Sequence, residues 1–137
     1  LTSVLLRDFT PVLVCREDNP FKKTTISTDE LKQLDLVSHL TGDEMIYQRK
    51  QSLLATLKDA HIVFETNSIM MLLTLLSETD CVGFLTPEAF TRYKVLFKLR
   101  QITPLFPLQL IGVYLVYRKE MEKKPSFMQL LEAIKGS

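Results

Sequence analysis

The pattern of apolar and polar positions indicates secondary structure most clearly between His61 and Pro87, in the stretch HIVFETNSIMMLLTLLSETDCVGFLTP. Short apolar runs at His61–Phe64 and Cys81–Thr86 predict two strands, and Asn67–Glu78 between them predicts a helix. Because the second run is almost entirely apolar, we expect a parallel sheet covered on both faces, with the helix as a right-handed crossover. The helix is apolar almost all round, which predicts burial between the sheet and another element.

Three side chains that can cap this helix stand at its start: Thr66, Asn67 and Ser68. They lie at the positive end of the helix dipole, where backbone N–H groups can also receive an anion. A capped core helix without a ligand is the simpler interpretation. Both interpretations stay open on these residues alone.

The same pattern extends along the whole chain as strands that alternate with helices. The further predicted elements are an extended lead-in at Leu1–Arg7, a strand at Pro11–Arg16, a turn at Glu17–Pro20, a capping-box helix from Ser27 to Leu34, a strand at Leu36–His39, a capping-box helix from Thr41 to Lys58, a helix at Glu88–Lys94 capped by Thr86, a strand at Leu96–Arg100, a strand at Leu110–Tyr117 and a final helix from Pro125 to Gly136. Two prolines break the chain at Thr103–Pro107, a candidate hinge. The alternation predicts an α/β fold with a mainly parallel sheet flanked by helices.

Composition narrows the classes of protein to consider. A chain of 137 residues predicts one domain, and 17 basic against 16 acidic residues leave a net charge of +1, so no strong footprint for nucleic acid or anionic lipid is visible. Cys15 and Cys81 lie in apolar runs, typical of reduced cysteines, although a disulfide stays open. With His39 and His61 as the only histidines and no Cys-x-x-Cys pair, a zinc site is not expected.

The start of the sequence and its lack of a targeting segment are relevant to where in the cell the protein is located. No signal peptide or membrane span is visible, and the chain starts at Leu1 without an initiator methionine, so a fragment or a trimmed product is expected. Reduced cysteines and the missing signal favour the cytoplasm, although a removed leader would look the same.

Catalytic motifs are not found. The four glycines are too far apart for a nucleophile elbow, a P-loop or a dinucleotide-binding turn. The paired carboxylates at Asp43-Glu44 and Glu17-Asp18 are explained by helix starts and surface positions. We therefore expect no enzyme.

Hydroxyl and imidazole groups instead follow several predicted strands. Ser38-His39 precede one predicted helix start, Glu65-Thr66 a second and Leu85-Thr86 a third. The carboxyl ends of parallel strands share one edge of a sheet, where ligands collect. These groups suit a small polar or anionic ligand held by hydrogen bonds, although each also has an interpretation as a helix cap.

Several strings resemble the C-terminal part of the effector-binding domain of LysR-type transcriptional regulators. FTPVLVCREDNPF is similar to the family's strand ending in Arg-x-x-His-Pro, with Asn19 in place of the usual histidine. TTISTDELKQLDLVSH, HIVFETNSIMMLLTLLSETDCVGFLTPEAF and PLQLIGVYLVYRKEMEKKPSFMQLLEAIKG resemble its later elements. Asp80 and Cys81 depart from the family, because they stand where glycines are common.

The resemblance implies a periplasmic-binding-protein-like fold (type 2) of two subdomains, with an effector in the cleft between them. Residues 1–108 would form most of the second subdomain and 109–137 the return to the first, while the rest of the first and the N-terminal winged helix-turn-helix would lie outside this chain. The side chains implied to face the effector are Ser38, His39, Leu40, Thr66, Asn67, Ser68, Phe84 and Thr86.

The resemblance implies no cofactor, a small metabolite that is polar or anionic, a homodimer or homotetramer, and DNA binding only through the N-terminal domain, with no membrane partner. A solute-binding protein of a transporter shares the fold and is the alternative; it would carry an export signal upstream instead of a helix-turn-helix. A third and weaker hypothesis is an α/β enzyme, which would need a catalytic group from outside this chain.

Overall fold

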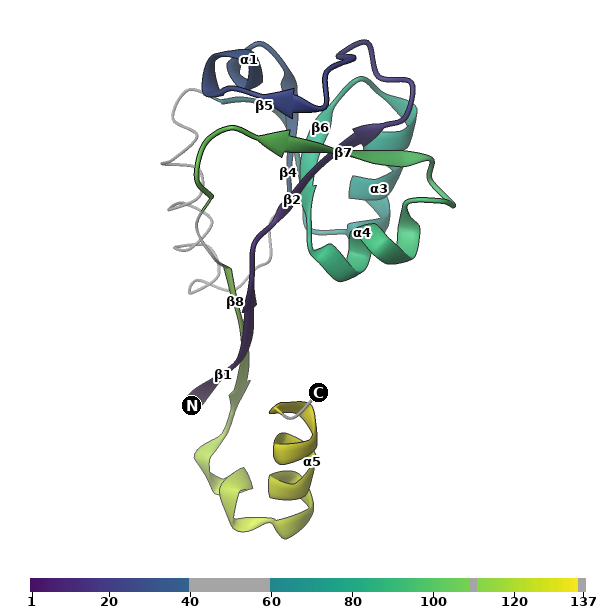
Figure 1. Cartoon of the computed structure of the whole chain (residues 1–137). Helices are drawn as coiled ribbons and strands as arrows, with labels where there is room; N and C mark the ends of the chain where they lie inside the picture. Colours follow the sequence, from purple (N-terminus) through teal and green to yellow (C-terminus); the bar gives the residue numbers. More distant parts are fainter. Residues whose placement is uncertain (40–59, 109–110, 136–137) are drawn as a thin grey trace. The chain divides into compact units, whose positions relative to one another are not determined.

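The computed structural model describes residues 1–39, 60–108 and 111–135, and the chain forms two compact units. One unit is Thr10–Gln109, and the other combines Leu1–Phe9 with Leu110–Ser137. The described elements of the first unit are β2 (Val12–Arg16), β3 (Thr25–Ile26), α1 (Thr28–Lys32), β4 (Asp35–His39), β5 (His61–Thr66), α3 (Ile69–Glu78), β6 (Val82–Leu85), α4 (Pro87–Tyr93) and β7 (Leu99–Pro104) (Figure 1). The helix predicted from Thr41 to Lys58 lies outside the described residues.

The strands of this unit form one six-stranded sheet in the order β3-β7-β2-β6-β4-β5. β4 pairs in parallel with β5 and β6, and β3 pairs in parallel with β7. β2 runs antiparallel to both of its neighbours, β6 and β7. The sheet is therefore mixed and mostly parallel, and the predicted α/β class with flanking helices is confirmed.

Each face of the sheet has its own apolar core, because successive residues of a strand point to opposite faces. Leu13 and Val14 are neighbours in β2, both are 0% exposed, and they belong to different cores. The core on the α1 side contains Leu13, Cys15, Ile26, Leu31, Leu36, Val82 and Ile102. The core under α3 and α4 contains Val14, Val37, Leu72, Leu73, Leu76, Cys81, Leu85 and Leu99. Cys15 and Cys81 are thus free, buried and on opposite faces of the sheet, which excludes the disulfide that the sequence left open.

α3 packs closely on the sheet because β6 carries Gly83 beneath it. A β-carbon added at Gly83 would lie 3.2 Å from Cδ2 of Leu76 and 3.4 Å from Cδ1 of Leu72. The outer side of the helix is open, since Met70 and Met71 are 51% and 50% exposed. The prediction that α3 is buried between the sheet and another element is therefore wrong for this outer side, because a helix in an outer layer buries one stripe only.

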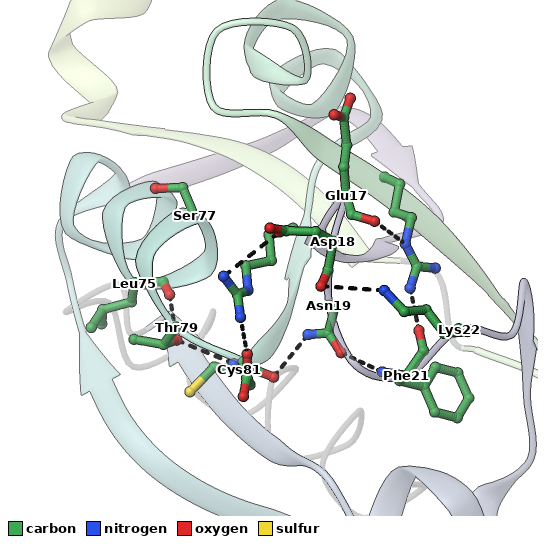
Figure 2. Close-up of polar contacts among 12 residues, drawn as sticks. Glu17, Asp18, Asn19, Phe21, Lys22, Leu75, Ser77, Thr79 and Cys81 are labelled. Carbon is green, nitrogen blue, oxygen red and sulfur yellow. Dashed lines mark hydrogen bonds and ion pairs between the residues drawn. The ribbon is translucent and has the colours of Figure 1, made fainter.

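The turn after β2 is held by the side chain of Asn19, which is 1% exposed. Its Nδ2 donates a hydrogen bond to the carbonyl of Asp80 at 2.9 Å, and its Oδ1 accepts one from the N–H of Phe21 at 2.9 Å. Figure 2 shows the Asn19 side chain between Phe21 and Cys81. The carboxylate of Asp80 also pairs with the guanidinium of Arg16. The predicted turn is present, and these bonds tie it to the segment between α3 and β6.

The stretch between α4 and β7 differs from the prediction. The sequence predicts a strand at Leu96–Arg100 and a break from Thr103, whereas β7 runs from Leu99 to Pro104. The chain continues its helical turn beyond Tyr93, since the N–H of Phe97 bonds to the carbonyl of Tyr93 at 3.0 Å. Leu96, Phe97 and Lys98 therefore belong to a turn after α4, and only Leu99 and Arg100 of the predicted strand lie in β7.

The second unit is built on an antiparallel pair of strands, β1 (Thr2–Phe9) and β8 (Ile111–Tyr117), followed by the 3-10 helix η1 (Lys119–Lys123) and α5 (Pro125–Lys135). The ring of Tyr117 lies 4.8 Å from that of Phe127, centroid to centroid, and its hydroxyl donates to Oε1 of Glu122 at 2.8 Å. The strand and the final helix predicted near the C-terminus are present. Leu1–Phe9 belongs with this unit through β8, whereas the family resemblance groups it with the residues up to 108.

Candidate functional site

Three parallel strands end side by side at one edge of the sheet. In the β4–β5 pairing, Ser38 lies opposite Glu65 and His39 opposite Thr66. In the β4–β6 pairing, Val37 lies opposite Gly83, so that Phe84 and Leu85 continue beside Ser38 and His39. The structure thus brings the strand ends predicted from the sequence to one edge.

The end of β4 contributes one buried and one half-buried polar residue. Ser38 is 8% exposed, and it is one of two polar residues in the buried part of the described chain. His39 is half-buried. Leu40, the third residue implied for this strand end, lies outside the described residues.

The segment between β5 and α3 is ordered by its own hydroxyl groups. Oγ1 of Thr66 accepts a hydrogen bond from the N–H of Ser68 at 3.1 Å. Oγ of Ser68 accepts one from the N–H of Met71 at 3.2 Å, which makes Ser68 the N-cap of α3. Asn67 between them is exposed. Because each cap uses an acceptor lone pair, each hydroxyl keeps an O–H that can donate to a ligand oxygen.

The end of β6 adds a third cap and an aromatic side chain. Oγ1 of Thr86 accepts from the N–H of Ala89 at 3.1 Å and Pro87 opens α4, as the sequence predicts. Phe84 is half-buried, and its side chain packs against the core on the α1 side. Phe84 therefore supports the edge through packing.

Two threonines at this edge are not among the site residues that the sequence predicts. β2 is antiparallel to β6, with Val12 opposite Leu85, so Thr10 just before β2 lies near the same edge. Thr103 near the end of β7 pairs with Thr25 of β3. Both threonines are exposed. No sequence signal could have found Thr10, because an apolar run does not reveal the direction of its strand.

The side chains at this edge can bind a ligand through hydrogen bonds. The other histidine, His61, stands at the opposite end of β5, where its Nδ1 lies 3.0 Å from Oδ1 of Asp35. Within residues 1–39, 60–108 and 111–135, no three His, Cys, Asp or Glu side chains gather closely enough to hold a metal ion. The arrangement offers hydroxyl donors and the start of α3, which together suit a small ligand with oxygen acceptors.

No helix in the described part of the chain combines the length and the apolar character needed to cross a membrane.

Comparison with known protein families identifies one family. The sequence profile of the LysR substrate binding domain matches residues 1–137. A search of curated protein sequences finds no match. Among solved structures, the chain is similar to the regulatory domain of MexT, a transcriptional activator in Pseudomonas aeruginosa, with a TM-score of 0.70 and 18% identity over 97% of this chain and 65% of that one.

Two further regulatory domains give comparable matches. That of MetR, a LysR family regulator from N. meningitidis, has a TM-score of 0.69 and 15% identity over 98% of this chain and 62% of that one. The CcmR regulatory domain from Synechocystis, solved in complex with 2-PG, has a TM-score of 0.75 and 12% identity over 98% of this chain and 65% of that one. At such identities the structural likeness shows the fold. This chain spans less than two thirds of the length of each.

Proposed function

The chain belongs to the LysR substrate-binding domain family, and on that premise we propose that it senses a small polar or anionic effector at the edge where β4, β5 and β6 end. The family is one of transcriptional regulators and not of enzymes. The ligand would be held by hydrogen bonds, and no cofactor or bond-breaking step is needed.

The observation that carries this proposal is that hydroxyl side chains gather at the edge of the sheet where β4, β5 and β6 end. Ser38 and His39 end β4, and Thr66 of the adjacent β5 lies opposite His39. Thr66 and Ser68 order the start of α3 through their acceptor lone pairs. The remaining O–H donors and the positive end of α3 favour a ligand that carries carboxylate, phosphate or hydroxyl oxygens. We assign Asn67 and Thr86 to the same site, and Leu40 and Phe84 to its apolar lining.

The effector would act by changing how subdomains sit relative to each other. In our proposal, residues 10–109 supply most of one subdomain, whereas Leu1–Phe9 and residues 110–137 belong to the other. Binding favours one relative orientation, and that orientation biases how a regulator dimer or tetramer sits on DNA through a separate N-terminal domain. Such a regulator works in the cytoplasm.

The experiment begins with the full-length natural protein and a panel of small carboxylates, sugar phosphates and amino acids, screened by thermal shift. For any compound that stabilises the protein, affinity is then measured by calorimetry on the wild type and on Thr66→Ala and Ser68→Ala. We expect each variant to lose about tenfold or more in affinity, since a hydrogen bond to a charged ligand contributes about 1.5–3 kcal/mol. Ser77→Ala is the matched control, because it removes a hydroxyl from the C-terminal part of α3, where Oγ donates to the carbonyl of Thr74.

Ser68→Asp separates the two roles of Ser68. Aspartate is as good an N-cap as serine, so helix α3 keeps its stability. Its carboxylate repels an anionic effector, so affinity is lost although the fold is kept. If both Thr66→Ala and Ser68→Asp bind the effector as the wild type does, the site lies elsewhere.

A further inference from the structure

The turn that joins α4 to β7 (Figure 1) carries two adjacent apolar residues that are exposed to solvent. Val95 is 80% exposed and Leu96 is 74% exposed. Among the large hydrophobic residues of the described chain, only the terminal Leu1 is more exposed. A small domain leaves single apolar side chains in water without consequence, but two adjacent ones at such exposure call for an explanation.

Hydrogen bonds hold this turn in one conformation. The N–H of Leu99 bonds to the carbonyl of Lys94 at 2.8 Å, and the carbonyl of Lys98 accepts from the N–H of Glu17 at 2.8 Å. Phe97 packs inward, edge-on to the ring of Tyr93 with 5.9 Å between centroids. The inward packing of Phe97 and Leu99 leaves the side chains between Lys94 and Phe97 directed to solvent.

Lys98 adopts a left-handed backbone conformation, with φ of 53°, and it is the only non-glycine residue with positive φ in the described chain. Glycine is the usual residue at this position after a helix, because it carries no steric penalty there. The chain therefore keeps a strained lysine where glycine would be more stable. Retained strain of this kind is a reason to look for a function at the turn.

The four charged side chains between residues 92 and 100 are all cationic, and Glu17 is the acidic residue that a hydrogen bond brings to the turn, from its N–H to the carbonyl of Lys98. Arg92, Lys94 and Lys98 flank the two apolar side chains, and none of the three forms an ion pair within the described residues. Lys94 lies over the ring of Phe90, 5.6 Å from its centroid. Arg100, next along β7, is already engaged with backbone carbonyls, including that of Glu17 at 3.2 Å. The turn thus carries an exposed apolar pair that is surrounded by cationic side chains.

We propose that this tip, made of Val95 and Leu96 with Arg92, Lys94 and Lys98, docks an acidic segment of a partner protein that carries apolar anchor residues. The apolar pair matches buried anchors at the centre of an interface, and the cations match carboxylates at its rim. Nucleic acid would use the cations and leave Val95 and Leu96 unexplained. A membrane surface needs a larger apolar face than two side chains supply.

The tip is independent of the proposed effector site. β7 runs in the same direction as β4, β5 and β6, because both β7 and β6 are antiparallel to β2. The start of β7 therefore lies at the edge of the sheet opposite the strand ends that carry Ser38 and Thr66. Failure of one proposal leaves the other untouched.

The test uses a display library of short random peptides, selected on the full chain and counter-selected on the double variant Val95→Ser/Leu96→Ser. We expect the selected peptides to be rich in Asp and Glu with one or two Leu or Phe residues. The strongest peptide should bind the double variant about tenfold or more weakly, the loss typical of a central anchor. Leu105→Ser is the matched control, because Leu105 is 65% exposed and follows the other end of β7.

Lys98→Gly tests the cationic part of the tip without loss of the fold, because glycine suits the left-handed conformation at this position. The variant should bind the acidic peptide more weakly and show a smaller salt dependence. Peptides that bind the double variant as well as they bind the wild type would overturn the proposal, as would selection of basic or neutral sequences. The same holds if phosphatidylserine vesicles or duplex DNA, but no acidic peptide, bind in a manner that depends on Val95 and Leu96.

Discussion

Replacement of Asn19 by alanine should destabilise the unit formed by residues 10–109 more than its place in a turn suggests. The side chain is 1% exposed, and it bridges two backbone groups, the carbonyl of Asp80 and the N–H of Phe21, each at 2.9 Å. Alanine leaves both groups without this partner in a partly buried site. At about 1–1.5 kcal/mol for each backbone group left unsatisfied, we expect the free energy of unfolding to fall by about 2–3 kcal/mol.

Urea unfolding followed by circular dichroism measures this change, and hydrogen exchange locates it. The amide of Phe21 should exchange with solvent much faster in Asn19→Ala, because its acceptor has been removed. Asp18→Asn is the matched control: Asp18 is the neighbour of Asn19, its side chain is 79% exposed, and its oxygen lies 3.6 Å from Arg16. An exposed ion pair contributes little, so this control should unfold as the wild type does. An unchanged urea midpoint for Asn19→Ala, or an equal loss in Asp18→Asn, would refute the reasoning.

Two further predictions concern packing and pH. Gly83→Val should lower the free energy of unfolding by about 2 kcal/mol, because even a β-carbon would lie 3.2 Å from Cδ2 of Leu76; an unchanged urea midpoint would show that α3 can move away from the sheet. Hydrogen bonds from the ammonium of Lys23 and from the backbone of Ser27 lower the pKa of Glu30 below its ordinary 4.5. The resulting stability is present above that ordinary pKa and is lost as the pH falls through the folded value, so Glu30→Gln should flatten the acid side of a plot of urea midpoint against pH.

Local signals along the chain determined most of the elements. The Ser27 capping box starts α1, Thr86 and Pro87 start α4, and the apolar runs around Val14, Val37 and Val82 form the strands. These features depend on residues within one or two turns of each other, which is why they can be read before any tertiary contact is known. The alternation of strands and helices likewise led to the correct fold class, and the strand ends that it predicts meet at one edge of the sheet.

Only the tertiary structure decided the features that depend on distant residues. The antiparallel direction of β2, and with it the position of Thr10, follows from pairing with β6 and β7. The burial of Asn19 requires Asp80, which lies 61 residues further along the chain. Cys15 and Cys81 are separated by the sheet itself, although both apolar runs look alike. In each case the deciding contact joins segments far apart in the sequence, and the local pattern of apolar and polar residues is the same whichever way they meet.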